Sequence, residues 1–233
     1  MLRTPATDRS VCSGVRTTRQ PDRSISGDDA DNIRLDVPAN RILVGYGSGA
    51  LAVIDAASSR KIADIPLSVH PEGFQLDPGS NRIFVNLPKA QAIAVVDHQS
   101  GRQTATWPTR VASGNFPMAI DQVSRHVLVA FRDPAKLGAF SMDDGNLITS
   151  PDICGDADDL FVDAKRRRVY ISCGEGFLDI LDSAQGAYRR VSRIATASGA
   201  RTSLFVPEMD RLMLAVRAST EEPAAIWVYQ PMQ

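Results

Sequence analysis

The sequence predicts an all-β fold, a β-propeller of about five four-stranded blades, and three observations lead to it. A twelve-residue pattern recurs along the chain about every 40 to 45 residues. Between its copies, short apolar runs are separated by turn-forming clusters rich in Gly, Pro, Asn and Ser. No segment shows a sustained apolar period of 3.6 residues, so long helices are not expected.

The repeat consists of an apolar pair, usually an Asp, four turn-type residues, and then Arg or His before an aliphatic run. Its copies are IRLDVPANRILV from Ile33, FQLDPGSNRIFV from Phe74, MAIDQVSRHVLV from Met118, LFVDAKRRRVYI from Leu160 and SLFVPEMDRLML from Ser203. The anchor positions, separated by 41, 44, 42 and 44 residues, are Asp36, Asp77, Asp121, Asp163 and Pro207. Blades are therefore expected to start near residues 27, 70, 114, 156 and 199.

Each of the first four units is predicted to form four strands joined by tight turns. In the second unit the expected strands are 73–77, 82–86, 92–97 and 102–107, bounded by PGSN, LPKAQ and HQSG. The apolar residues alternate or run continuously, as they do when a sheet is packed between two neighbouring sheets. The fifth unit offers only three strands, 203–207, 211–216 and 224–229, before the sequence ends at Gln233.

Composition places the chain among globular proteins with one domain. It has 233 residues, of which 43% are hydrophobic, and a formal net charge of −1 with a pI near 6.3. These values give no general attraction to nucleic acid or to an anionic membrane, so neither partner is expected. Residues 1–26 carry no apolar signal region and are expected to be disordered, and residues 27–233 to form the propeller. As written, the chain is expected to be cytoplasmic.

Residues 83–108, IFVNLPKAQAIAVVDHQSGRQTATWP, resemble the YVTN-type β-propeller repeat of bacterial proteins. The resemblance extends over residues 27–233, and GDADD, CGEGFLDI and GARTSLFVPE are similar to segments in the last two blades of particular members. It implies a fold related to seven-bladed rings, and relatives that are periplasmic or secreted and of poorly defined activity. The repeat itself indicates a fold and not a function.

The missing fourth strand of the fifth unit predicts an incomplete ring. Residues 1–26 offer no comparable strand, so we expect an open arc that corresponds to part of a seven-bladed ring. A closed five-bladed ring is the alternative. An open arc has exposed sheet edges, which favour self-association.

The segments that link one blade to the next carry the candidate functional residues. These links, residues 27–32, 68–73, 112–117, 155–159 and 198–203, are expected to surround one mouth of the central channel, here called the rim. The residues expected to bind a ligand there are Asp29, Asp31, His70, Glu72, Asn115, Asp156, Asp158, Asp159 and Arg201.

Three interpretations of the rim carboxylates are open. They can accept hydrogen bonds from backbone N–H groups of the tight links, which is a structural role. They can form a site for a divalent cation or a small polar ligand, and no other cofactor is predicted. They can act as a catalytic acid and base, although nothing in the sequence supplies a nucleophile.

The histidines and cysteines have mainly structural interpretations. His98 is expected to be a solvated turn residue, His126 lies at a strand edge, and no closely spaced His and Cys set indicates zinc. Cys154 and Cys173 are expected to be two buried unpaired thiols, with a disulfide between them as the alternative.

The predicted function is that of a non-enzymatic scaffold that binds a small polar ligand, a cation or a protein partner on the rim. One alternative is the remnant of a cofactor-dependent or metal-dependent enzyme, quinoprotein-like or lactonase-like. Another is a degenerate fragment without an independent function.

Overall fold

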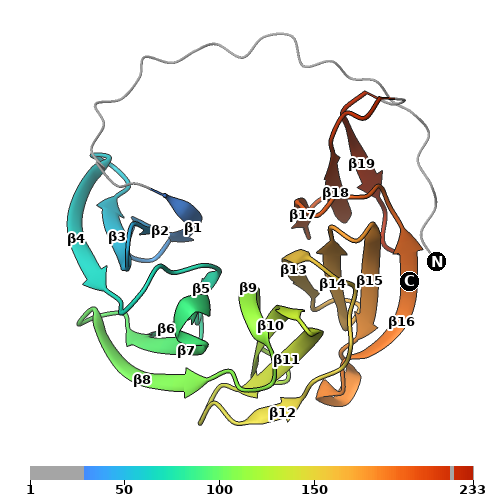
Figure 1. Cartoon of the computed structure of the whole chain (residues 1–233). Helices are drawn as coiled ribbons and strands as arrows, with labels where there is room; N and C mark the ends of the chain where they lie inside the picture. The colour runs from blue at the N-terminus through green and yellow to red at the C-terminus, as the bar shows by residue number, and fades with distance from the viewer. Residues whose placement is uncertain (1–28, 221–222, 233) are drawn as a thin grey trace.

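The computed structural model describes residues 29–220 and 223–232 and confirms the β-propeller fold (Figure 1). The strands form five antiparallel sheets, and within each sheet neighbours in sequence are neighbours in space. In the described residues, the only helices are two three-residue 3-10 turns, Pro88–Ala90 and Ala184–Gly186. Accordingly, no helix in this part of the chain is long and apolar enough to cross a membrane.

The five sheets are named blades 1 to 5 in chain order. Blade 1 comprises β1 (Asp31–Asp36), β2 (Arg41–Tyr46), β3 (Ala50–Asp55) and β4 (Arg60–Pro66). Blade 2 comprises β5 (Phe74–Leu76), β6 (Arg82–Leu87), β7 (Ala92–Asp97) and β8 (Arg102–Pro108). Blade 3 comprises β9 (Ser113–Asp121), β10 (His126–Asp133), β11 (Ala135–Ser141) and β12 (Leu147–Thr149). Blade 4 comprises β13 (Ala157–Asp163), β14 (Arg168–Cys173), β15 (Phe177–Asp182) and β16 (Arg189–Ala195), and blade 5 comprises β17 (Ser203–Val206), β18 (Arg211–Val216) and β19 (Ala225–Tyr229).

The blades follow one another around a common centre, with the first strand of each blade innermost (Figure 1). Blades 1 and 5 stand apart at the open side of this arc, and in the described residues no strand of blade 1 pairs with a strand of blade 5. Residues 1–26, which the sequence predicts to be disordered, lie outside the described residues.

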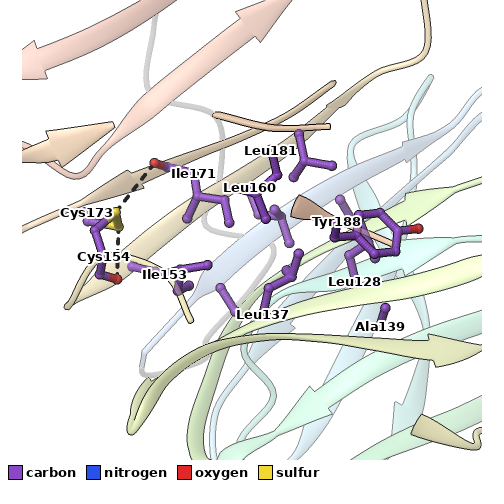
Figure 2. Packing of buried hydrophobic residues seen from close by; sticks show 14 residues of the cluster. Leu128, Leu137, Ala139, Ile153, Cys154, Leu160, Ile171, Cys173, Leu181 and Tyr188 are labelled. Carbon is purple, nitrogen blue, oxygen red and sulfur yellow. Dashed lines mark hydrogen bonds between the residues drawn. A yellow bond between two sulfur atoms is a disulfide. The ribbon is translucent and has the colours of Figure 1, made fainter. Parts of the chain in front are cut away.

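The hydrophobic core consists of four layers, each between two neighbouring blades. Alternate side chains of one strand serve two layers: Ile83 and Val85 of β6 face blade 1, whereas Phe84 faces blade 3. Figure 2 shows the layer between blades 3 and 4, in which Leu128 and Leu137 pack near Leu160. Because both faces of an inner strand are buried, these strands read as continuous apolar runs in the sequence.

The repeated aspartate ends the first strand of blades 1, 3 and 4, directly follows the first strand of blade 2, and is buried in all four; these residues are Asp36, Asp77, Asp121 and Asp163. Each accepts hydrogen bonds from the turn that follows, as Asp121 does from the N–H groups of Val123 and Ser124. Most also reach the next blade. Asp77 accepts from Gln122 at 3.1 Å, and Asp121 accepts from the hydroxyl of Tyr188 at 2.9 Å. The repeated carboxylate therefore holds the turn and joins adjacent blades.

The fifth anchor differs from the prediction by one residue. In blade 4 Asp163 pairs with Arg168, and the equivalent pair in blade 5 is Val206 with Arg211. Val206, and not Pro207, therefore takes the place of the aspartate. The aligned copies already place Val206 there, because it is the fourth residue of SLFVPEMDRLML just as Asp163 is the fourth residue of LFVDAKRRRVYI. Pro207 as the anchor is therefore a misalignment by one residue.

Two structural interpretations of single residues need correction. His98 was expected to be solvated, but its Nε2 lies 3.1 Å from Oδ2 of Asp36, so it belongs to the contact between blades 1 and 2. Cys154 and Cys173 were expected to be unpaired, but they form a disulfide, with their Cα atoms 5.8 Å apart. The pairing follows from register, because Ala157 at the start of β13 lies opposite Cys173 at the end of β14.

Candidate functional site

The rim residues separate into two groups with different electrostatics. In blades 3 to 5, two aspartates alternate with two arginines. Between blades 1 and 2, carboxylates gather around a histidine. We call the first group, Arg132, Asp156, Asp158 and Arg201, the arginine network, and the second group, Asp31, His70 and Glu72, the acid–histidine group.

Each aspartate of the arginine network contacts both arginines. Asp158 lies 2.6 Å from Nη2 of Arg132 and 3.6 Å from Nε of Arg201. Asp156 lies 2.6 Å from Nη1 of Arg201 and 3.3 Å from Nε of Arg132. The hydrogen bond to Asp156 raises the pKa of Arg201 above its ordinary value. Two negative and two positive charges balance here, so a metal ion would have to displace an arginine.

Arg132 is the member of this network that sequence reasoning missed. It lies near the end of β10, stacks on the ring of Phe116 at 4.0 Å, and donates from Nε to the carbonyl of Ala157. Arg132 lies in β10 and not in a link, but the register of β9 and β10 places its neighbour Phe131 opposite Asn115, which is a link residue. The end of a blade's second strand thus lies beside its link, so a charged residue at that position can reach the rim.

The side chains of Asp159 and Asn115 make hydrogen bonds that hold the fold together. The carboxylate of Asp159 accepts the N–H of Ser203 at 2.6 Å and so joins blade 4 to blade 5. Burial, together with the charge of Asp158, raises the pKa of Asp159 to about 6. Asn115 is fully buried, and its Nδ2 donates to Oδ1 of Asn86 and to the carbonyl of Ala92. Asn115 therefore does not face the open rim, contrary to expectation.

The acid–histidine group brings together ligand atoms from distant parts of the sequence. Asp31 begins β1, and His70 and Glu72 lie in the link that leads to β5. One ligand atom from each lies within 4.8 Å of the other two. Asp29 is a further neighbour, with its Oδ2 3.8 Å from Nε2 of His70. Three such atoms can share one metal ion.

The hydrogen bond of His70 orients its ring for such a role. Nδ1 lies 2.6 Å from the carbonyl oxygen of Gly47. A carbonyl can only accept, so Nδ1 carries the hydrogen, and in the neutral ring Nε2 keeps its lone pair. A backbone carbonyl on the second ring nitrogen is the arrangement common to metal-binding histidines.

Glu72 is in an environment that disfavours its charge. Burial raises the pKa of Glu72 to about 7, and the hydrogen bond and charge of Asp31 contribute in the same direction. The positive charge of Arg132 acts against this increase, and the negative charge of Asp29 adds to it. Near neutral pH, Glu72 can keep a proton that a divalent cation would replace.

These two raised pKa values predict how stability depends on pH without metal. Because the folded state holds protons on Glu72 and Asp159 more tightly than the unfolded state, unfolding releases protons between about pH 4 and 7. The free energy of unfolding should therefore fall by roughly 1 to 2 kcal/mol from pH 5.5 to pH 8 in chelator. Carboxylates with lowered pKa, such as Asp77, oppose this trend only at more acidic pH. Urea titrations at both pH values measure it.

Glu72→Gln is the control for this pH dependence. The amide cannot titrate, so the variant should lose much of the difference between pH 5.5 and pH 8 and should be the more stable protein at pH 8. An unchanged pH dependence in the variant would contradict the assignment to Glu72.

Comparisons with known proteins support the fold. No protein-family model matches the chain, and a search of curated proteins finds no match. The chain is similar to Kuenenia stuttgartiensis hydrazine synthase, with a TM-score of 0.68 and 14% identity over 87% of this chain and 59% of that chain. It is also similar to a chain in the crystal structure of the mitotic checkpoint complex, with a TM-score of 0.68 and 14% identity over 82% of this chain and 60% of that chain.

At this identity the similarity shows the β-propeller fold alone. The chain spans about three fifths of the length of both structures. The likeness to YVTN-type repeats stays a resemblance, since no family model matches.

Proposed function

We propose that this chain is a non-enzymatic binding β-propeller whose rim holds a divalent cation through Asp31, His70 and Glu72. The observation that carries the proposal is the approach of these three ligand atoms to within 4.8 Å of one another. A cation there would offer its remaining coordination positions to a small polar ligand or to an acidic group of a protein partner.

The donor set favours a particular class of cation. Imidazole nitrogen combined with carboxylate oxygen suits first-row transition ions such as Mn²⁺ and Zn²⁺. Calcium prefers six to eight oxygen ligands and gains little from a histidine. The sequence contains no closely spaced His and Cys set that would indicate zinc; in the fold, His70 instead meets the carboxylates of Asp31 and Glu72.

The disulfide supports a proposal about the compartment. Disulfides persist in oxidising environments and are rare where cellular thiols are kept reduced. The bond between Cys154 and Cys173 therefore favours an oxidising compartment, as in the periplasmic or secreted relatives, over the cytoplasm.

Thermal unfolding with and without metal tests the cation site. At an ion concentration a hundredfold above Kd, binding should stabilise the fold by about 2.7 kcal/mol. For a domain of this size that corresponds to a rise in Tm of roughly 5 to 10 °C. Mn²⁺ or Zn²⁺ should give the rise, and Ca²⁺ and Mg²⁺ should give less. Glu72→Gln and His70→Gln should both abolish it.

Asp158→Asn is the matched control, because it removes a rim carboxylate that already has two arginine partners. This variant should keep the full metal response and lose only a little stability in chelator. Absence of a metal response in the wild type would contradict the cation site. So would a response that survives Glu72→Gln and disappears in Asp158→Asn.

A further inference from the structure

The end of the propeller opposite the rim carries a concentration of positive charge in blade 4. Four cations stand in succession there, from Lys165 in the turn after β13 to Arg168 at the start of β14. Because β13 runs from the rim to Asp163, this turn lies at the far end of the blade. Met232, which follows the last strand of blade 5, lies beside the same turn.

A cavity of about 290 Å³ opens at this end of blades 4 and 5. The described residues that line it are Lys165, Arg166, Arg168 and Met232. Three cationic side chains and one apolar side chain therefore surround it. Carboxylates also occur in the neighbouring turns, but none of those in the described part of the chain lines this cavity; they are Asp163, Asp182, Glu208 and Asp210. The volume is close to the lower end of the range found for small-molecule pockets.

Arg166 is held in place by two of these carboxylates. Its Nη1 and Nη2 each lie 2.6 Å from an oxygen of Asp210, and Nη1 also lies 3.0 Å from Asp163. The side chain of Arg166 is only 10% exposed, and its Nε is buried without an acceptor among the described residues. A buried N–H without an acceptor is unfavourable, and an oxyanion in the cavity that Arg166 lines would supply one.

Lys165 and Arg168 keep N–H groups for a ligand. Lys165 is exposed and makes no hydrogen bond or ion pair with another described residue. Arg168 has one loose partner, Asp182 at 3.5 Å, and its side chain is 34% exposed. The cavity therefore combines two cations that can accept a new partner with a third that is fixed and partly unsatisfied. This combination favours an anionic ligand.

We propose that this cavity binds a small phosphate monoester, with the phosphate against Lys165 and Arg168 and the organic part against Met232. A phosphate accepts charge-assisted hydrogen bonds from both lysine and arginine. Because a water molecule takes about 30 Å³ in the liquid, a cavity of this volume holds more than the five heavy atoms of a phosphate ion. The site lies at the opposite end of the blades from Asp31, His70 and Glu72, so it is independent of the proposed cation site.

Isothermal titration calorimetry in metal-free buffer tests the site, with glycerol 3-phosphate and inorganic phosphate as the two probes. Without metal, a cation on the rim cannot contribute to phosphate binding. The wild type should bind one equivalent of glycerol 3-phosphate, more tightly than inorganic phosphate, and glycerol should not bind. Lys165→Gln should raise the Kd for glycerol 3-phosphate about tenfold, because one charge-assisted contact is lost. Arg168→Gln should have a similar effect, and circular dichroism verifies that both variants fold.

Lys89→Gln is the matched control, because Lys89 is an exposed lysine in the turn Pro88–Ala90, at the rim end of blade 2. This variant should bind glycerol 3-phosphate like the wild type. A wild type without saturable binding would overturn the proposal, as would an unchanged Kd in both Lys165→Gln and Arg168→Gln. Equal affinity for the two probes would show a site for a bare anion and overturn it too. So would an equal loss in Lys89→Gln, which would show an effect of overall charge.

Discussion

Asp179→Ala is expected to lower the free energy of unfolding by about 3 kcal/mol. The carboxylate of Asp179 in β15 is fully buried and accepts two hydrogen bonds from Arg193, at 2.7 and 2.8 Å. It also accepts the N–H of Cys154 at 2.8 Å. Its removal leaves a buried N–H and a guanidinium without their acceptor, in the core layer between blades 3 and 4. Urea unfolding followed by circular dichroism measures the change.

Asp152→Ala is the matched control for this prediction. Asp152 likewise forms an ion pair, with Lys136 at 2.5 Å, but its side chain is 79% exposed, whereas Asp179 is buried beside Arg193 and Arg190. Water can replace that contact, so the variant should unfold at nearly the wild-type urea concentration. Equal losses in the two variants would contradict the assignment of the Asp179 effect to burial.

Removing the disulfide is expected to lower the free energy of unfolding by about as much as Asp179→Ala does. The bond joins cysteines separated by 19 residues, and closing a loop of that length restricts the unfolded chain by about 3 kcal/mol. The variant with Cys154→Ser and Cys173→Ser should therefore melt about 10 °C below the oxidised wild type. Differential scanning calorimetry gives both melting temperatures.

A reductant supplies the control for the disulfide. Adding it should bring the melting temperature of the wild type toward that of the double variant and should leave the double variant unchanged. Wild-type protein whose melting temperature does not respond to oxidant or reductant would contradict the pairing of Cys154 with Cys173.

The period of the repeat and its turn residues were sufficient to predict the blades. Observed first strands begin at Asp31, Phe74, Ser113, Ala157 and Ser203, close to the predicted blade starts. Both signals are local: a tight turn needs particular residue types, and a strand packed on both faces needs a continuous apolar run. The fifth anchor is the exception, because Val206 and not Pro207 occupies its place, as the alignment of Arg211 with the Arg or His of the other copies already indicates.

Contacts between blades could not be predicted in the same way. His98 approaches Asp36 and Arg132 approaches Asp158 because neighbouring sheets stack at a set angle, and the period does not encode that angle. The sequence predicted that Asp31, His70 and Glu72 lie on one rim, but it did not distinguish these carboxylates from those of Asp156 and Asp158. Only the position of the arginines distinguishes a charge-balanced half of the rim from a half with excess negative charge.

Anomalous diffraction from a crystal grown with Mn²⁺ tests the cation site most directly. The account predicts one strong anomalous peak within coordination distance of Nε2 of His70 and of carboxylate oxygens of Asp31 and Glu72. It also predicts no peak at the arginine network, where Asp156 and Asp158 are already neutralised. A peak beside Asp158, or none between Asp31, His70 and Glu72 at saturating Mn²⁺, would contradict it.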